Sequence, residues 1–105
     1  MGSKPRVAPG KKFMFLSIGF ERPTPEQMKE WGAWFKSIGD RMIDQGGFWS
    51  GGREFTKQGS TELTFGPDAI TGYVVFTAED RADAEALTSK CPVVASNRVY
   101  EIMSK

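Results

Sequence analysis

The sequence predicts an α+β fold, a ferredoxin-like split βαβ with an extra β-hairpin, and three observations lead to this prediction. Segments typical of strands and helices follow one another in the order strand, helix, strand, hairpin, strand, helix, strand. Two strand segments, residues 12–20 and 73–78, are apolar at both odd and even positions, which is typical of strands covered on both faces. The length of 105 residues suits a single hydrophobic core.

The chain is expected to divide into a flexible basic tail, residues 1–11, and a single domain, residues 12–105. Four of the 14 Lys and Arg residues, and none of the 13 Asp and Glu residues, lie in the first 12 positions. A nucleic-acid-binding domain should instead carry a basic body or a basic stripe. The charge pattern therefore favours a solvated tail and predicts no nucleic-acid partner.

The first half of the domain is expected to form a strand over residues 12–20 and then a long helix. Thr24 is placed to cap this helix, Pro25 suits its first position, and Gln27 completes a capping box. A glycine pair predicts that the helix ends near Gln45. The apolar side chains at helical spacing are Met28, Trp31, Phe35, Ile38 and Met42.

The second half of the domain is expected to complete the sheet and add a second helix. Pro92 should end this helix, and Cys91 on its apolar stripe is interpreted as a small core residue. The expected segments are, in order, a strand from Phe48 that is interrupted by Gly51 and Gly52, a hairpin of residues 53–57 and 61–65, a strand over 71–78, a helix capped by Glu79 or Asp80, and a strand over 98–103.

The apolar character of both sheet faces predicts a second layer besides the helices. If Phe13, Phe15, Tyr73 and Val75 faced water, each would forfeit roughly 1.5–3 kcal/mol of burial energy. The four losses together are comparable with the whole stability of a small domain, about 5–15 kcal/mol. The simplest cover is the same face of a second copy, which would give a homodimer with two-fold symmetry. The alternative is that the hairpin at 53–65 folds over this face.

The first strand leaves open which of its two sets of side chains faces the helices. The even set, Met14, Leu16 and Ile18, is the more continuously apolar, and we expect it to face them. The odd set includes Ser17 and Gly19, which suit the wall of a cavity.

Several segments of residues 12–103 match one known family in order and in length. They are the strand KFMFLSIG, the helix TPEQMKEWGAWFKSIGDRMIDQGG, the hairpin leading into TFGPD, the segment TGYVVFTAEDRADAEAL and the closing CPVV and RVYEIM. In these segments the chain resembles the YCII-related (DGPF-type) family of dimeric α+β barrel proteins. The resemblance implies that fold and a homodimer, and implies little about activity.

The chain departs from the family pattern at its signature element. Residues Phe65-Gly66-Pro67-Asp68 stand where the family usually has Asp-Gly-Pro-Phe, and the charged stretch that usually follows is missing before Gly72. Some relatives have a His–Asp pair proposed as catalytic. This chain has no histidine, so that pair cannot be carried over and Asp68 alone occupies its neighbourhood.

Asp68 is the candidate catalytic residue. A carboxylate at a turn beside a closed cavity can acquire a raised pKa and transfer a proton. The alternative is structural, because an Asp after Gly-Pro can complete a turn by accepting hydrogen bonds from its own backbone.

The candidate substrate-binding residues combine aromatic rings, a hydroxyl and two cations. Arg53 and Arg98 could hold an anionic group through bidentate hydrogen bonds, or could be surface charges at strand edges. Tyr73 offers a ring and a hydroxyl, and Trp49 beside Ser50 lies next to the glycine pair. For the aromatic residues, packing is the competing role.

The composition bears on which metals and cofactors, and which cellular location, are expected. Without histidine, a zinc site or a histidine-ligated haem is not expected, and neither a cofactor nor a metal is predicted. One cysteine permits no internal disulfide, which favours a reducing compartment. The sequence has no apolar run long enough to cross a bilayer and no recognisable leader, so a cytoplasmic protein with no membrane partner is expected.

Three functions are compatible with these residues, and whether the protein is an enzyme stays open. The first is a small homodimer with a small-molecule cavity, with proton transfer through Asp68 as an option. The second is a cofactor-free oxygenase or isomerase of the dimeric α+β barrel type. The third is a non-catalytic regulatory or interaction module.

Overall fold

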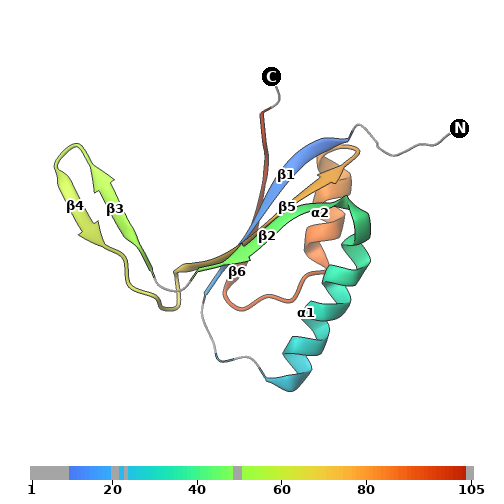
Figure 1. Ribbon diagram of the computed structural model, residues 1–105, viewed down its shortest axis with the longest axis horizontal. Coiled ribbons are helices and arrows are strands. Elements are labelled where there is room, and N and C mark those ends of the chain that lie inside the picture. Colours follow the sequence, from blue (N-terminus) through green and yellow to red (C-terminus); the bar gives the residue numbers. More distant parts are fainter. Residues whose placement is uncertain (1–9, 20–21, 23, 49–50, 104–105) are drawn as a thin grey trace, which may run out of the picture.

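The computed structural model describes residues 10–19, 22, 24–48 and 51–103. These residues form a four-stranded sheet with two α-helices on one of its faces, and a separate two-stranded hairpin (Figure 1). The elements are β1 (Lys11–Ile18), α1 (Pro25–Ile38), a 3₁₀ turn η1 (Gly39–Arg41), β2 (Met42–Gly47), β3 (Arg53–Thr56), β4 (Gly59–Glu62), β5 (Ile70–Ala78), α2 (Arg81–Ser89) and β6 (Ser96–Glu101). The predicted α+β class is confirmed.

The sheet has the strand order β2-β5-β1-β6, and each neighbouring pair is antiparallel. The two strands with apolar residues on both faces, β1 and β5, are therefore its central pair, as the sequence predicts. Each helix follows a central strand and returns the chain to an edge strand. This arrangement is consistent with a ferredoxin-like α+β fold.

The start of α1 was predicted correctly and its end was not. The Thr24 hydroxyl accepts a hydrogen bond from the Gln27 backbone N–H at 3.1 Å, and the Gln27 side chain accepts one from the Thr24 N–H at 2.9 Å. The helix ends at Ile38 because Gly39 has φ +61°, a backbone conformation that favours glycine.

The expected continuation of α1 to Gln45 is wrong, because Met42–Gly47 is the edge strand β2. Met42 does continue the helical spacing, but pairing with β5 decides the conformation, with Gln45 opposite Val74. The strand expected to begin at Phe48 therefore begins six residues earlier. The Phe48 backbone N–H extends the ladder by donating to the Thr71 carbonyl at 3.0 Å.

The helix-facing core is built on the odd residues of β1, so the expectation that the even set faces the helices is wrong. In the register of the central pair, Phe13 lies opposite Phe76 and Phe15 lies opposite Val74, and all four side chains are buried. The rings of Phe13 and Phe76 stack at 6.0 Å. Two phenylalanines fill the wide space beneath α1 better than a methionine and a leucine would, so size decides the orientation rather than continuity of apolar residues.

The opposite side of the sheet, which we call the open face, carries Met14 and Leu16 of β1 and Tyr73 and Val75 of β5. Each of these side chains is only partly buried in the single chain. Both faces of the sheet are thus apolar, as predicted. The assignment of side chains to the two faces differs from the expected one, because Phe13 and Phe15 lie on the helix side.

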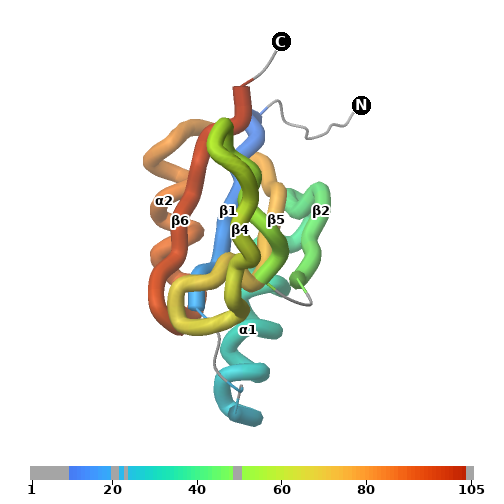
Figure 2. Tube along the Cα trace, turned by 90° about the vertical axis from the view of Figure 1, so that its left-hand side faces the viewer, coloured from blue at the N-terminus to red at the C-terminus, as the bar shows by residue number. Residues whose placement is uncertain are grey.

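The hairpin β3–β4, which we call the arm (residues 53–62), leaves the body on the side of the open face (Figure 1). Seen from that side, β4 crosses in front of β1 and β5 (Figure 2). The arm nevertheless packs chiefly on itself, and does not fold down onto its own sheet as the alternative prediction required. Because it projects, the radius of gyration is 15.7 Å, against about 13 Å for a compact chain of this size.

Neither helix in the described part of the chain has both the length and the apolar character needed to span a membrane.

Candidate functional site

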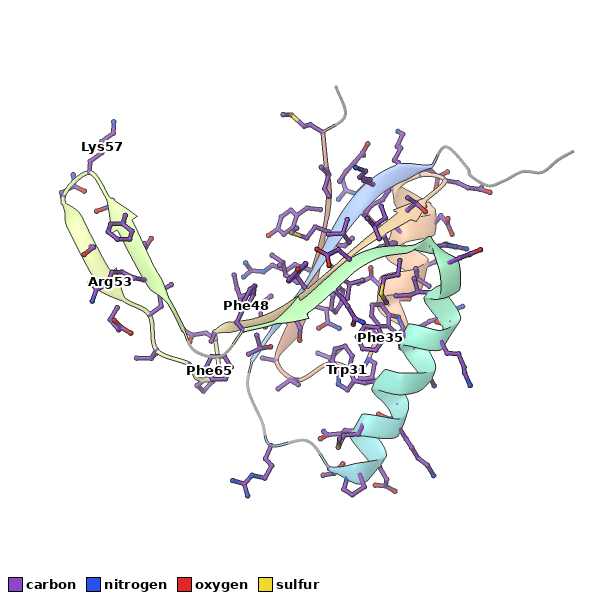
Figure 3. All side chains as sticks on the ribbon, in the orientation of Figure 1. Trp31, Phe35, Phe48, Arg53, Lys57 and Phe65 are labelled. Atoms are coloured by element: carbon purple, nitrogen blue, oxygen red, sulfur yellow. The ribbon has the colours of Figure 1, made fainter. Side chains whose placement is uncertain are left out.

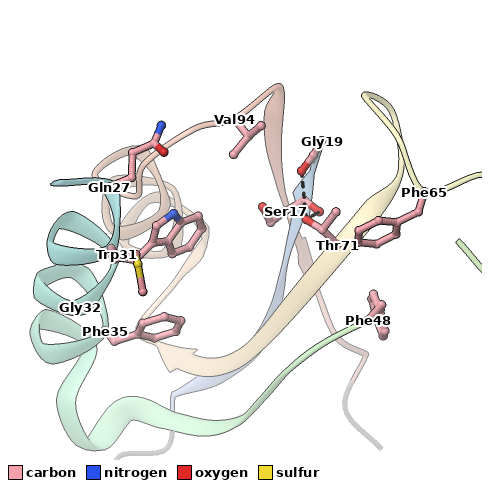
Figure 4. Close-up of a pocket in the computed structure, with 11 residues that line it drawn as sticks. Ser17, Gly19, Gln27, Trp31, Gly32, Phe35, Phe48, Phe65, Thr71 and Val94 are labelled. Atoms are coloured by element: carbon pink, nitrogen blue, oxygen red, sulfur yellow. Dashed lines mark hydrogen bonds between the residues drawn. The ribbon is translucent and has the colours of Figure 1, made fainter. Parts of the chain in front are cut away.

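A cleft of about 550 Å³ opens between α1 and the end of the sheet (Figure 4). On one wall, side chains of α1 point across the cleft, and on the other lie the ends of β1 and β5 with the two chain segments that lead to the arm. The lining residues are Ser17, Gly19, Gln27, Met28, Trp31, Gly32, Phe35, Phe48, Phe65, Thr71 and Val94. The cleft therefore lies on the helix side of the sheet.

The cleft exists because α1 is anchored at its C-terminal half. The buried side chains of α1 are Trp34 and Ile38, and the Trp34 indole N–H donates to the Leu87 carbonyl of α2 at 3.0 Å. The N-terminal half has no buried residue, and it stands off from the sheet. Trp31 lies at the boundary between the two halves of α1, and its ring meets that of Phe15 edge-on, with the ring centroids 6.4 Å apart.

Aromatic residues from both walls are among those that line the cleft, and Figure 3 labels four of them, Trp31, Phe35, Phe48 and Phe65. Trp31 and Phe35 project from α1 toward the sheet, and their ring centroids are 6.0 Å apart. Phe48 and Phe65 lie where the chain leaves the sheet for the arm and returns from it. Phe48 also stacks on Tyr73 at 5.9 Å. A planar molecule in the cleft would contact the Trp31 and Phe35 rings on the helix side.

The polar groups of the cleft are uncharged. Ser17 is buried at the end of β1, and the Thr71 hydroxyl is 3.2 Å from each of the carbonyl oxygens of Ser17 and Gly19. Gln27 contributes a side-chain amide, held in place by the capping box. Among the described residues that line the cleft, none is ionisable. The cleft suits an uncharged ligand with a few hydrogen-bonding groups.

Asp68, the predicted catalytic residue, does not reach this cleft. It is exposed and lines a separate cavity of about 330 Å³ together with Glu62, Leu63 and Ile70. Arg53 lies on the arm, where its guanidinium donates to Ser60 and to Glu62, each at 3.0 Å. Its charge is therefore already paired.

Tyr73 and Arg98 lie on the open face and do not line the cleft, although the Tyr73 ring stacks on that of Phe48. The Tyr73 hydroxyl donates to the Asp44 carboxylate at 3.0 Å. This hydrogen bond raises the pKa of Tyr73, with smaller contributions from burial and from the negative charge of Asp44. Arg98 is exposed on β6 opposite Leu16. Trp49 and Ser50 lie outside the described residues. The described members of the predicted set therefore do not meet in one site.

Most of the cleft residues carry no sequence signal that marks them as a site. Ser17 and Gly19 were recognised as suiting a cavity wall, and both line the cleft. Trp31 and Phe35 belong to the apolar stripe of α1, and helical spacing does not distinguish a buried ring from one at the edge of a cleft. Thr71 carries no local signal.

Cys91 is not a candidate nucleophile. It is buried, and burial raises the pKa of its thiol to about 12, so the reactive thiolate is scarce near neutral pH. Among the described residues, no group of three or more His, Cys, Asp or Glu side chains is placed to hold a metal ion.

This chain matches no protein-family model, no curated protein and no solved structure. The function is therefore argued from the geometry of the site.

Proposed function

We propose that this chain is a homodimeric protein that binds a small, uncharged, partly aromatic molecule in the cleft beneath α1. The observation that carries the proposal is the lining of that cleft. Its volume of about 550 Å³ lies within the range of small-molecule sites, about 300–1,000 Å³. Aromatic residues stand on both walls, and the described polar residues between them, Ser17, Gln27 and Thr71, are uncharged.

Binding without chemistry is the form of the proposal that the geometry favours. Acid–base catalysis needs a titratable group within hydrogen-bond reach of the ligand. Asp68 lines a different cavity, and the ionisable residues Arg53, Tyr73 and Arg98 lie on the arm or the open face. A cofactor-free oxygenase or isomerase has less support for the same reason.

The homodimer is supported by the open face. Met14, Leu16, Tyr73 and Val75 form a partly exposed apolar strip on the two central strands. Such a strip on a small protein is typical of an interface. A second copy that placed its own open face against this one would give the dimeric α+β barrel that the resemblance to the YCII-related family implies. A cytoplasmic location belongs to the same proposal.

A matched pair of ligands tests the cleft. We expect 2-naphthol to quench tryptophan fluorescence and to bind more tightly than 2-naphthoate, because a carboxylate entering an uncharged cleft loses hydration without gaining a partner. Trp31→Leu should weaken the binding of 2-naphthol at least tenfold through the loss of ring contact.

Asp68→Asn is the matched control, because it changes the neighbouring cavity and not the cleft. It should leave the affinity for 2-naphthol unchanged. Tighter binding of the naphthoate, or a loss of binding in Asp68→Asn and not in Trp31→Leu, would show that the cleft is not the site.

A further inference from the structure

We propose that the arm of each subunit lies across the open face of a second copy, with the Phe55 ring against the apolar side chains there. The inference rests on the proposed homodimer and adds the segment that completes its interface. The partner is thus a second copy of this chain, held by exchange of the two arms.

The arm has one face built to meet another surface. In the hairpin register, Arg53 pairs with Glu62 and Phe55 pairs with Ser60, so these four side chains share a face. The Arg53 guanidinium bonds both Ser60 and Glu62, which leaves this face with mutually satisfied polar groups. Beside them the Phe55 ring is 77% exposed. A large unburied ring framed by paired polar groups is typical of an interface anchor.

The arm also lacks support of its own. A two-stranded hairpin is marginally stable in water unless it packs on another surface. Here the strands bond each other and stand clear of the body (Figure 1). The opposite face of the hairpin carries Glu54 and Thr61, which do not need burial. The Phe55 face is therefore the one that gains from a partner.

The two strands of the arm stay paired down to its root. The hairpin ladder continues below β3 and β4, where the Leu63 N–H donates to the Gly52 carbonyl at 2.8 Å. Gly51 lies so close to the Leu63 backbone that an added Cβ would overlap the carbonyl oxygen. This close approach keeps the two strands of the arm together as one unit down to Gly51.

The area of the open face shows why the arm is needed. Eight residues of β1 extend about 26 Å, and four strands about 4.8 Å apart are about 19 Å wide, so the flat face measures about 500 Å². Two such faces bury about 1,000 Å², the lower limit for a specific interface. Each arm adds the area of its Phe55 face on the same side of the molecule, which raises the total above that limit.

The first test measures the dimer dissociation constant by sedimentation equilibrium. Phe55→Ser should raise this constant at least tenfold, the effect of losing an interface anchor. Thr61→Ser, on the opposite face of the arm, should leave it unchanged. Because Phe55 is exposed in the single chain, Phe55→Ser should keep the circular dichroism spectrum of the wild type. Equal dissociation constants for the two variants would overturn the proposal.

The second test locates the ring directly. Phe55 is replaced by p-benzoylphenylalanine, and unlabelled and ¹⁵N-labelled chains are mixed and irradiated. We expect mixed-isotope cross-links to peptides that contain Met14, Leu16, Val75 or Tyr100 on the open face. Cross-links within one chain, or to the helix side of the partner, would overturn arm exchange.

The tests separate this inference from the homodimer itself. A wild-type chain that stays monomeric at all concentrations would rule out both the homodimer and arm exchange. A dimer that survives Phe55→Ser unchanged and gives no mixed-isotope cross-link removes arm exchange and leaves the homodimer in place.

Discussion

Replacing neighbouring residues on opposite faces of β1 tests the two-sided sheet in a single strand. Phe15 is 1% exposed and lies against Trp34, with their ring centroids 5.0 Å apart. Phe15→Ala leaves a cavity beneath α1 and should cost about 3–5 kcal/mol of the free energy of unfolding. Leu16 faces the other way and is partly buried in one chain. Full burial of a leucine side chain contributes about 1.5–3 kcal/mol, so Leu16→Ala should cost about 1–2 kcal/mol in the isolated subunit.

Urea unfolding at two protein concentrations a hundredfold apart distinguishes the two losses. Mass action stabilises a dimer as concentration rises, so the cost of Leu16→Ala should grow at the higher concentration. The cost of Phe15→Ala comes from the core of one subunit and should be similar at both. If Leu16→Ala costs as much as Phe15→Ala at the lower concentration, or if neither cost depends on concentration, the assignment of the two faces is refuted.

Three further predictions follow from single contacts. With the other tyrosine replaced by Phe, absorbance at 295 nm should show Tyr73 titrating above its ordinary pKa of 10.0, and Asp44→Asn should bring it back toward that value. Because the folded-state pKa is the higher one, the stability from this bond is present below the unfolded pKa and is lost as pH rises through the folded pKa. A Tyr73 titration unaffected by Asp44→Asn would contradict this cause. Cys91 should react with a thiol reagent at pH 8 only after unfolding, whereas rapid native-state labelling would disprove its burial. In Gly46→Ala the new Cβ would lie 2.6 Å from Tyr73 Cε1 and should cost about 1–3 kcal/mol in urea unfolding, and Gly47→Ala, whose Cβ meets its nearest atom at 3.6 Å, serves as its control.

The parts of the fold that depend on local signals were predictable. Thr24 and Gln27 mark the start of α1 through a capping box, which is a contact between residues three apart. The double apolar character of β1 and β5 predicted their central place in the sheet. The hairpin was recognised from its turn, although its strands are shorter than expected.

The predictions for residues 42–47 and for the orientation of β1 are wrong because strand pairing and core volume determine these features. Residues 42–47 fit a helix by spacing, but they gain more by pairing with β5, which lies far away in the sequence. The orientation of β1 depends on the space beneath α1, which one strand does not reveal.

The cleft was largely hidden because it joins residues from α1, β1, β5 and the root of the arm. Asp68 and Arg98 stood out as charged residues, but they lie in other parts of the surface. Selecting residues by chemical reactivity overlooked a site made of rings and neutral polar groups.

Sedimentation equilibrium of the wild type and of Leu16→Asp tests most directly whether the open face is covered by a second copy. A wild-type mass of twice the chain mass of 11.6 kDa is expected, and 11.6 kDa for a folded Leu16→Asp variant. The new carboxylate, opposite Arg98 on β6, is hydrated in the single chain and would lose that hydration in the interface, which opposes association. A wild-type mass of 11.6 kDa at every concentration, or a Leu16→Asp variant that dimerises as tightly as the wild type, would contradict a cover by a second copy.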